Sequence, residues 1–254
     1  MMHAFEGRTA LVTGAGRGIG REIARQLAAT GTTVALLARS RDQLDETARL
    51  IADAGHKSLV VPVDLTARAQ RTAAVRAVRD ELGPVDILIN NAAVAGPIGA
   101  TVEMDPAEWA TTVEIALVAP VELTTALLPD MLDRKWGRIV NLSTAGVAAS
   151  RTLLGTNAYL AAKAGLETHS LNLAAELAGS GVSVNIYRPG LVDTAMSALV
   201  EDKMRAYLPA LAADIERRRR AGAMLTPEAS AAALLAHLDH DETGKIWHVD
   251  KTVG

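Results

Sequence analysis

The chain has 254 residues, and 49% of them are apolar, so it is long enough to bury one sizeable core and is neither a small disulfide scaffold nor a disordered tail. It contains no cysteine, which excludes disulfides, thiolate catalysis, zinc-thiolate sites and iron-sulfur clusters, so any redox chemistry must come from a bound cofactor. Lys and Arg number 26 and Asp and Glu 29, a formal net charge of -3, so no global positive field draws the protein to nucleic acid.

Short β-forming runs alternate with longer amphipathic stretches along the chain. Seven runs predict strands, at residues 8–13, 32–38, 57–63, 85–90, 137–143, 182–188 and 245–249. They are continuously apolar instead of alternating, as burial on both faces of a parallel sheet requires. The stretches between them carry apolar residues at helical spacing. The sequence therefore predicts an α/β fold: one domain over residues 1–254, with a Rossmann-like, doubly wound, seven-stranded parallel sheet and helices on both faces.

A glycine-rich turn, residues 14–20, separates the first predicted strand from the first predicted helix. Glycine lets the backbone approach a pyrophosphate closely, and the N-terminus of the following helix offers free amide hydrogens and a positive dipole end. The turn does not match the G-x-G-x-x-G fingerprint, so by itself it fits a tight strand-to-helix turn as well as a nucleotide site.

Tyr159 and Lys163 lie four residues apart on one predicted helix, so their side chains share a face. A cation about 4 Å from a phenol, at an effective dielectric of about 20, offers at most roughly 4 kcal/mol, or about 3 pKa units. Such a neighbour would bring a tyrosine into the range of a general acid near neutral pH. An ordinary Tyr and Lys pair on a surface helix is the alternative for these two residues alone.

Residues 191–225 interrupt the alternation of strands and helices. A long insertion after the sixth strand lies at the sheet edge where open α/β folds bind ligands, which predicts a substrate lid, with a solvated helical excursion as the alternative. The Arg217–Arg220 run spans a whole helical turn, so most of it should face water, with a role in binding an acidic substrate as the alternative. The following apolar residues of the lid indicate a fairly apolar substrate: Leu191, Met196, Leu199, Met204, Tyr207, Leu208, Leu211 and Met224.

Five motifs in one order resemble those of the short-chain dehydrogenase/reductase family, and the resemblance covers essentially the whole chain. They are the turn residues Thr13, Gly14, Gly18 and Gly20 (T-G-x-x-x-G-x-G), Asn90 to Ala93 (N-N-A-G in the family), Ser143 after the fifth strand, Tyr159 with Lys163 (Y-x-x-x-K), and Pro189, Gly190 and Thr194 (P-G-x-x-x-T). The resemblance implies an NAD(P)-dependent oxidoreductase of class EC 1.1.1, a ketoreductase that moves a hydride between nicotinamide and a carbonyl or alcohol carbon of a small, fairly apolar substrate.

The resemblance also implies roles for the catalytic residues. Tyr159 exchanges a proton with the carbonyl or alcohol oxygen, and Lys163 also holds the nicotinamide ribose hydroxyls. The family usually ends its fifth strand in Ser-Ser and uses the second serine to orient the substrate oxygen. Register places that role on Thr144 and residue type places it on Ser143, so both remain candidates.

Contacts with the dinucleotide are implied for the glycine turn, the strand ends, the catalytic pair and the segment after the sixth strand. These residues are Gly14, Arg17, Gly18, Ile19, Gly20, Arg39, Ser40, Asp64, Leu65, Asn91, Ala92, Tyr159, Lys163, Pro189, Gly190, Val192 and Thr194. Asp64 is expected beside the adenine. An NAD-preferring enzyme usually has an acidic residue about 20 residues after the turn, whereas Arg39 there and Arg17 in the turn can grip a 2′-phosphate. We therefore predict NADP(H) in preference to NAD(H).

One departure from the family pattern concerns the proton relay. The family commonly has an Asn seven residues after the Trp of its fourth helix, and counting from Trp109 reaches Ala116. The relay is then absent or rebuilt from other groups. This departure leaves two alternatives open: a dinucleotide-binding regulator or scaffold with little turnover, and a reductase of C=N or C=C bonds.

The predicted partners are few. No His and carboxylate pair has metal-ligand spacing, so no metal is expected. Apolar runs too short to span a bilayer and an N-terminus without a secretory apolar core predict a cytoplasmic protein with no membrane or nucleic-acid partner. The apolar stretch 109–132 and the helix of Tyr159 pack across a two-fold axis in the family, which predicts a homodimer or homotetramer.

Overall fold

A computed structural model describes residues 5–249 of the chain. Within these residues one parallel sheet has the strand order β3-β2-β1-β4-β5-β6-β7. The strands are β1 (Thr9–Thr13), β2 (Thr33–Ala38), β3 (Ser58–Pro62), β4 (Ile87–Asn90), β5 (Gly137–Leu142), β6 (Val182–Arg188) and β7 (Ile246–His248). The predicted seven-stranded sheet is confirmed. Its strand order reverses between β1 and β4, the point at which open α/β sheets form a ligand crevice.

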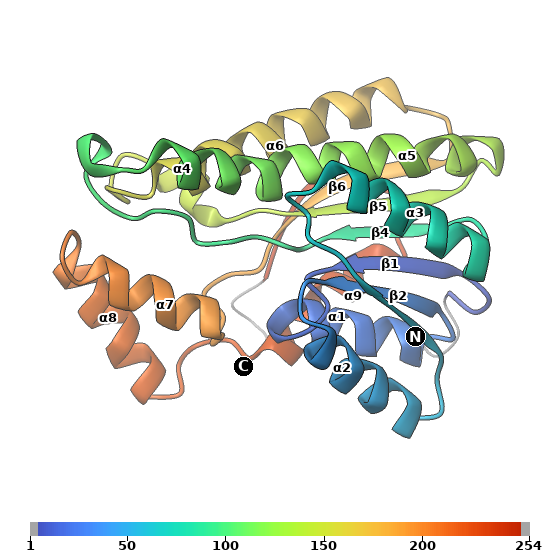
Figure 1. Cartoon of the computed structure of the whole chain (residues 1–254), viewed down its shortest axis with the longest axis horizontal. Helices are drawn as coiled ribbons and strands as arrows, with labels where there is room; N and C mark the ends of the chain where they lie inside the picture. Colours follow the sequence, from blue (N-terminus) through green and yellow to red (C-terminus); the bar gives the residue numbers. More distant parts are fainter. Residues whose placement is uncertain (1–4, 250–254) are drawn as a thin grey trace.

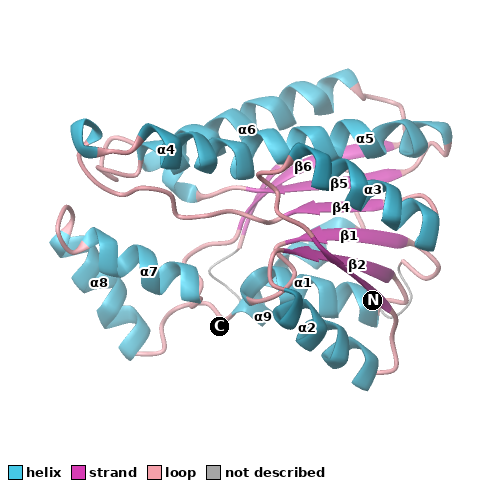
Figure 2. Cartoon of the chain, in the orientation of Figure 1, coloured by secondary structure: helices cyan, strands magenta, loops and turns pink. Residues whose placement is uncertain are grey.

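Helices cover both faces of this sheet (Figures 1 and 2). One layer contains α1 (Gly18–Ala29), α2 (Arg41–Asp53) and α9 (Pro227–Leu238), and the other contains α3 (Arg68–Leu82), α5 (Ala119–Asp133) and α6 (Asn157–Glu176). Successive strand residues point to opposite faces, so Val12 joins the core cluster under the first layer and Leu11 joins the cluster under the second. Both faces are buried, which explains the continuously apolar strands.

A single helical stretch, Pro106–Asp133, runs along the edge of the second layer. It consists of α4 (Pro106–Val113), a π-helical turn η2 (Glu114–Val118) and α5. Its length, and an 18-residue window within it that has a mean hydropathy of 1.5, would allow it to cross a membrane, which corrects the expectation that every apolar run is too short. Here η2 and α4 pack on α6, and α5 packs on α3, and these contacts bury 44% of that window.

Residues 193–224 form an excursion from the sheet that contains α7 (Ala195–Met204) and α8 (Pro209–Arg220). Figure 1 shows the two helices side by side, set apart from the layers on the side where the strands end. A parallel bridge between Val192 and Leu225 closes its base. The amide of Asp193 donates to the carbonyl of Leu225 (2.9 Å), and the amide of Leu225 donates to that of Leu191 (3.1 Å). Two short 3-10 turns, η1 (Thr101–Glu103) and η3 (Ala145–Ala149), follow β4 and β5.

Candidate active site

A cavity of about 570 Å³ lies at the carboxyl ends of the strands. Its wall is formed by the glycine turn, the ends of β2 to β6, the first turns of α6, and the excursion. Every residue predicted to contact the dinucleotide lines it, and so do Ser143 and Thr144. The structure therefore brings together, around one cavity, residues that are up to 180 positions apart between Gly14 and Thr194.

The glycine turn needs its glycines because other groups approach it closely. Gly14 has a φ of 68°, in the left-handed region, and a Cβ there would lie 2.7 Å from Asn91 Nδ2. A Cβ on Gly20 would collide with the carbonyl oxygen of Gly14. Asn91 Nδ2 donates to the carbonyl of Thr13 (2.8 Å), and the amide of Asn91 donates to Thr13 Oγ1 (3.0 Å). The end of β4 thus holds the turn in place.

The turn and its surroundings fit a dinucleotide. Within residues 5–249, no side chain caps the N-terminus of α1, so its first amides and the positive end of its dipole face the cavity wall, where an anion can bind. Arg17 and Arg39 are both exposed and line the cavity. Hydrogen bonds from the amide and hydroxyl of Thr66 lower the pKa of Asp64, and the charge of Arg39 adds to this effect.

Lys163 is buried (2% exposed), and its Nζ donates to the carbonyl of Leu142 at the end of β5 (2.6 Å). Burial lowers the pKa of Lys163 to about 8, and the charge of Glu167 opposes this shift. Burial raises the pKa of Tyr159 to about 12. The prediction that Lys163 lowers the phenol pKa is therefore wrong for this structure. The ammonium is bound to a carbonyl and lies 5.9 Å from the centre of the Tyr159 ring, so desolvation of the phenol dominates.

The two candidate hydroxyls at the end of β5 have different partners. Ser143 is buried, and its Oγ donates to Glu167 Oε1 (2.6 Å). Thr144 is partly exposed, and its Oγ1 accepts the amide of Gly146 at the start of η3 (3.1 Å), a bond that does not use the hydroxyl hydrogen. Adjacent residues of extended backbone point in opposite directions, which accounts for this division.

A buried ion pair near Lys163 was not predicted from the sequence. Glu167 on α6 accepts two hydrogen bonds from Arg188 at the end of β6, from Nε (2.8 Å) and Nη2 (2.7 Å). The two side chains are 9% and 12% exposed. A signal was present, because Glu167 follows Lys163 by four residues and Arg188 stands directly before Pro189 and Gly190, but neither position belongs to the motifs of the family.

Ala116, at the position where the family commonly has Asn, lies fully buried in the π-helical turn η2. π-Helical turns are frequent at functional sites, and this one packs against α6, the helix of Tyr159 and Lys163. The methyl group of Ala116 has no atom that could hold a water molecule by a hydrogen bond. The hydrogen bonds of the Lys163 ammonium must therefore come from polar groups other than a water molecule held at position 116.

The excursion contributes an apolar wall to the cavity. Leu191, Met196 and Met204 line it as expected, and Val200 and Ile215 join them. Other expected residues lie elsewhere: Leu199 is exposed, and the hydroxyl of Tyr207 donates to Glu103 (2.9 Å) beside a second, shallower pocket. The composition of the excursion indicated an apolar wall correctly, but it could not tell which helix faces point to the cavity.

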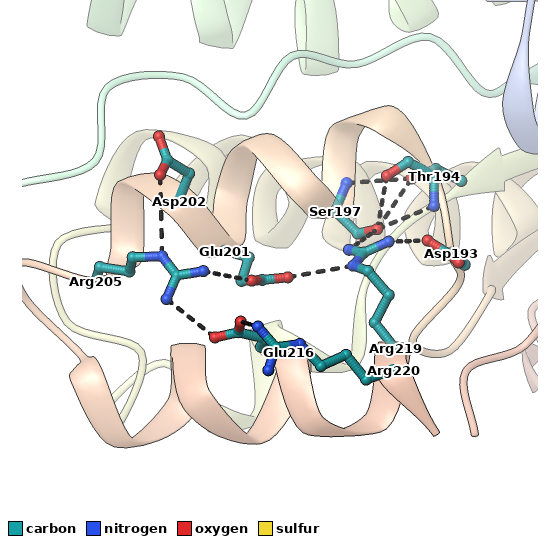
Figure 3. A network of polar contacts seen from close by, with 9 residues as sticks. All are labelled: Asp193, Thr194, Ser197, Glu201, Asp202, Arg205, Glu216, Arg219 and Arg220. Carbon is teal, nitrogen blue, oxygen red and sulfur yellow. Dashed lines mark hydrogen bonds and ion pairs between the residues drawn. The ribbon is translucent and has the colours of Figure 1, made fainter. Parts of the chain in front are cut away.

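The arginine run of α8 is neutralised by carboxylates. Arg217 and Arg218 pair with Asp214, and Arg220 pairs with Glu216. Figure 3 shows the remaining member, Arg219, reaching from α8 to α7. It pairs with Asp193 and Glu201 and donates to Ser197 Oγ (3.1 Å). The run thus joins the two helices of the excursion, and Arg219 is half-buried where the sequence suggested a residue facing water.

Ser197 in turn belongs to the cap of α7. Thr194 Oγ1 accepts the amide of Ser197 (3.2 Å), and Ser197 Oγ accepts the amide of Thr194 (3.0 Å). This capping box satisfies two amides at the start of the helix. It also links Arg219 to Thr194, a predicted contact of the cofactor (Figure 3).

Comparisons with known proteins identify the family of the chain and several of its relatives. The sequence model of a family described as short chain dehydrogenase matches residues 8–205. The 3-oxoacyl-[acyl-carrier-protein] reductase FabG of Escherichia coli strain K12 is 36% identical over 253 residues, 97% of each chain. Two solved structures cover 98% of this chain and 97% of their own: a point variant of actinorhodin polyketide ketoreductase with NADPH (TM-score 0.86, 32% identity), and the L-sorbose reductase of Gluconobacter frateurii with NADPH and L-sorbose (TM-score 0.85, 27% identity).

Proposed function

Since the chain belongs to the short-chain dehydrogenase/reductase family and is an oxidoreductase, we propose that it is an NADP(H)-dependent enzyme that interconverts a carbonyl and an alcohol on a fairly apolar substrate. The observation that carries this proposal is the meeting of Tyr159, Lys163 and Thr144 with the glycine turn around one cavity. A purified protein that binds NADPH and oxidises it in the presence of a ketone would support the proposal.

In this reaction NADPH supplies the hydride, and the residues of the chain bind, orient and move a proton. Thr144 donates a hydrogen bond to the oxygen of the substrate and stabilises its developing negative charge. Tyr159 gives a proton to the same oxygen in reduction and takes it back in oxidation. Lys163 holds the ribose hydroxyls, as the family resemblance implies. Ser143 is assigned no chemical step, because its hydroxyl is bound to Glu167.

The preference for NADP(H) is supported by Arg17 and Arg39, whose exposed side chains line the cavity. A hydrogen bond to a charged group contributes about 1.5–3 kcal/mol, so Arg39→Ala should weaken NADPH binding about tenfold or more and leave NADH binding nearly unchanged. Arg41→Ala is the matched control, because Arg41 is exposed two residues later and pairs with Asp45 outside the cavity lining. NADH bound as tightly as NADPH would contradict this preference.

The substrate class is tested by a screen that follows NADPH absorbance. The panel should contain 3-oxoacyl thioesters, aromatic and cyclic ketones, and ketoses, since the named relatives include a 3-oxoacyl and a polyketide reductase and a sorbose reductase. The apolar wall of Leu191, Met196 and Met204 favours the first two groups. Imines and activated alkenes test the C=N and C=C alternatives. A protein that binds NADPH and turns over none of these compounds would fit the regulator alternative.

The enzyme is proposed to be a cytoplasmic homodimer or homotetramer. Trp109 on α4, Leu132 on α5 and Leu171 on α6 are large apolar side chains that stay exposed on the helices predicted to form the interface. Symmetric burial of such residues is typical of homo-oligomers. A monomer in sedimentation at micromolar concentration would contradict the assignment.

A further inference from the structure

Lys163 occupies a place on α6 between a phenol and a carboxylate. Tyr159 precedes it by one helical turn and Glu167 follows it by one helical turn, so all three side chains share one face. Glu167 is held by the two hydrogen bonds from Arg188 and by the one from Ser143 Oγ. Three charge-assisted hydrogen bonds fix the carboxylate in one orientation.

The ammonium of Lys163 needs an anionic neighbour because it is buried. A buried charge is costly unless it is paired, and the carbonyl of Leu142, to which Nζ donates, carries no net charge. That carbonyl orients the ammonium but does not neutralise it. The carboxylate of Glu167 is the group whose charge favours the protonated form of Lys163 and so raises its pKa against the effect of burial.

The other charged side chains on α6 and on the elements beside it have partners of their own or face solvent. From β6, Arg188 faces Glu167, and from η2, Glu114 pairs with Arg71 of α3 (2.7 Å). On α4, Glu108 is exposed, and further along α6, His169 interacts with Glu176. The segment after β6 carries Asp193, which pairs with Arg219. Residues 145–149 of η3 contain no titratable side chain.

We propose that Glu167 is a positioning residue for Lys163: held by Arg188 and Ser143, its carboxylate keeps the buried ammonium charged and in place between Tyr159 and the carbonyl of Leu142. The proposal rests on the proposed function, in which Lys163 holds the cofactor ribose. It also gives Ser143 a role, as a donor to Glu167 and not to the substrate. Because Ala116 offers no polar group, Glu167, Arg188 and Ser143 are the polar residues that support Lys163 from the side of β5 and β6.

The sequence makes a direct test practical, because the full chain has only six lysines: Lys57, Lys135, Lys163, Lys203, Lys245 and Lys251. Protein labelled with carbon-13 at the lysine ε-carbon gives six signals whose pH titrations can be followed without cofactor, and the signal lost in Lys163→Arg identifies Lys163. Its midpoint in the unaltered protein is expected near pH 8. Glu167→Gln keeps the shape of the side chain and removes its charge, so the midpoint should fall by about one to three pH units.

Two controls separate a local effect from a general one. Glu176→Gln removes the same charge from a later turn of α6 and should leave the midpoint of Lys163 where it was. Glu167→Asp keeps the charge and should titrate closer to the unaltered protein than to Glu167→Gln. A folded Glu167→Gln protein with an unchanged midpoint overturns the proposal, and so does an equal shift in Glu176→Gln.

Glu167→Gln leaves Arg188 buried without its partner, and if this protein does not fold, the double variant Glu167→Gln with Arg188→Gln takes its place. Replacing both charges of a buried pair is often tolerated. Arg188→Gln alone is the reference for the double variant, because both proteins lack the Arg188 cation. The midpoint of Lys163 must be lower in the double variant than in Arg188→Gln, and equal midpoints overturn the proposal.

A turnover measurement adds an independent readout. In Glu167→Gln, the alkaline limb of kcat/KM should move to lower pH with the midpoint of Lys163, and Glu167→Asp should restore it. A purely structural role would lower the rate equally at every pH, and that result counts against the proposal. Because the NMR titration needs no cofactor, a shifted midpoint without any turnover would contradict the proposed function and leave the role of Glu167 intact.

Discussion

Two networks of arginines and carboxylates hold different parts of this molecule. The Glu167–Arg188 pair ties α6 to β6 and is 9% and 12% exposed. Arg219 of α8 is 24% exposed and pairs with Asp193, which is 50% exposed, and with Glu201 of α7, which is 8% exposed. Exposed pairs gain little and exchange readily with water, while a buried pair that loses one partner leaves an uncompensated charge. The other arginines of the excursion are more than half exposed, so the difference indicates a fixed wall along α6, where the proposed catalytic residues lie, and a cover, the excursion, most of whose ion pairs can rearrange.

The largest effect is expected when a tyrosine is replaced by phenylalanine, once on α6 and once in the excursion. Tyr159→Phe keeps the ring and removes the acidic hydrogen, so turnover should fall by about 10² to 10⁴ or more while NADPH binding persists. Tyr207→Phe removes a hydroxyl that binds Glu103 in the second pocket and should keep turnover nearly intact. Rates with a ketone substrate and NADPH binding by fluorescence measure both variants. A loss of turnover in Tyr159→Phe no larger than that in Tyr207→Phe would contradict the assignment of the proton donor to Tyr159.

The next effect concerns stability. Arg188→Gln removes one partner of the buried pair and should lower the free energy of unfolding by about 3–5 kcal/mol. Urea unfolding followed by circular dichroism measures this change. A loss no greater than that of a surface variant would show that the pair on α6 is as adaptable as the excursion, and the comparison between the two networks would then fail.

A third prediction separates the two hydroxyls at the end of β5. Thr144→Val removes the proposed donor to the substrate oxygen and should reduce kcat by about 10² to 10³. Ser143→Ala should cost less in rate and more in stability, because the bond that it loses is the one to Glu167. Steady-state kinetics and urea unfolding of both variants test this division. The reverse pattern would make Ser143 the donor.

The pH dependence of cofactor binding gives a smaller effect. The pKa of Lys163 is lowered from 10.5 to about 8 by burial, so its ammonium is present below that pH and is lost as the pH rises through it. NADPH affinity should therefore weaken above about pH 8, well before an exposed lysine would lose its proton near 10.4. Fluorescence titrations of NADPH across this range measure the midpoint. Affinity that holds steady up to pH 10 would show that the ammonium does not carry the ribose contact.

The smallest effect is expected at the exposed end of the excursion network. Arg220 is mostly exposed and pairs with Glu216 within α8, so Arg220→Gln should produce no measurable change in the urea midpoint. A destabilisation that approaches that of Arg188→Gln would show that the excursion is held as firmly as α6.

The sheet and much of the cavity lining could be predicted from the sequence because each depends on local patterns. Continuously apolar runs indicate strands buried on both faces, and glycines at fixed spacing indicate a turn that other groups approach closely, as Asn91 does at Gly14. The order of the family motifs along the chain indicated which turns and strand ends lie around the same site. The cofactor contacts that the motifs imply all line the cavity.

What could not be predicted depends on how separate elements pack. Glu167 and Arg188 are 21 residues apart on a helix and a strand, and only the packing of α6 on β6 brings them together. The pKa of Tyr159 was predicted in the wrong direction because burial of the phenol raises it, and the Lys163 ammonium, which donates to the carbonyl of Leu142, does not offset that burial. Which residues of the excursion face the cavity also depends on packing, because it is set by the orientation of α7 and α8 relative to the cavity.

The bridge between Val192 and Leu225 has a consequence for how such a protein can diversify. Its hydrogen bonds hold the two ends of residues 193–224 next to each other. The distance between these ends therefore does not depend on the segment that joins them. The entropy of closing a loop grows slowly with its length, and a segment with joined ends tolerates insertion and replacement. The excursion is therefore a segment that evolution or an engineer could replace to admit another compound, while the residues of α6 proposed to transfer the proton stay unchanged.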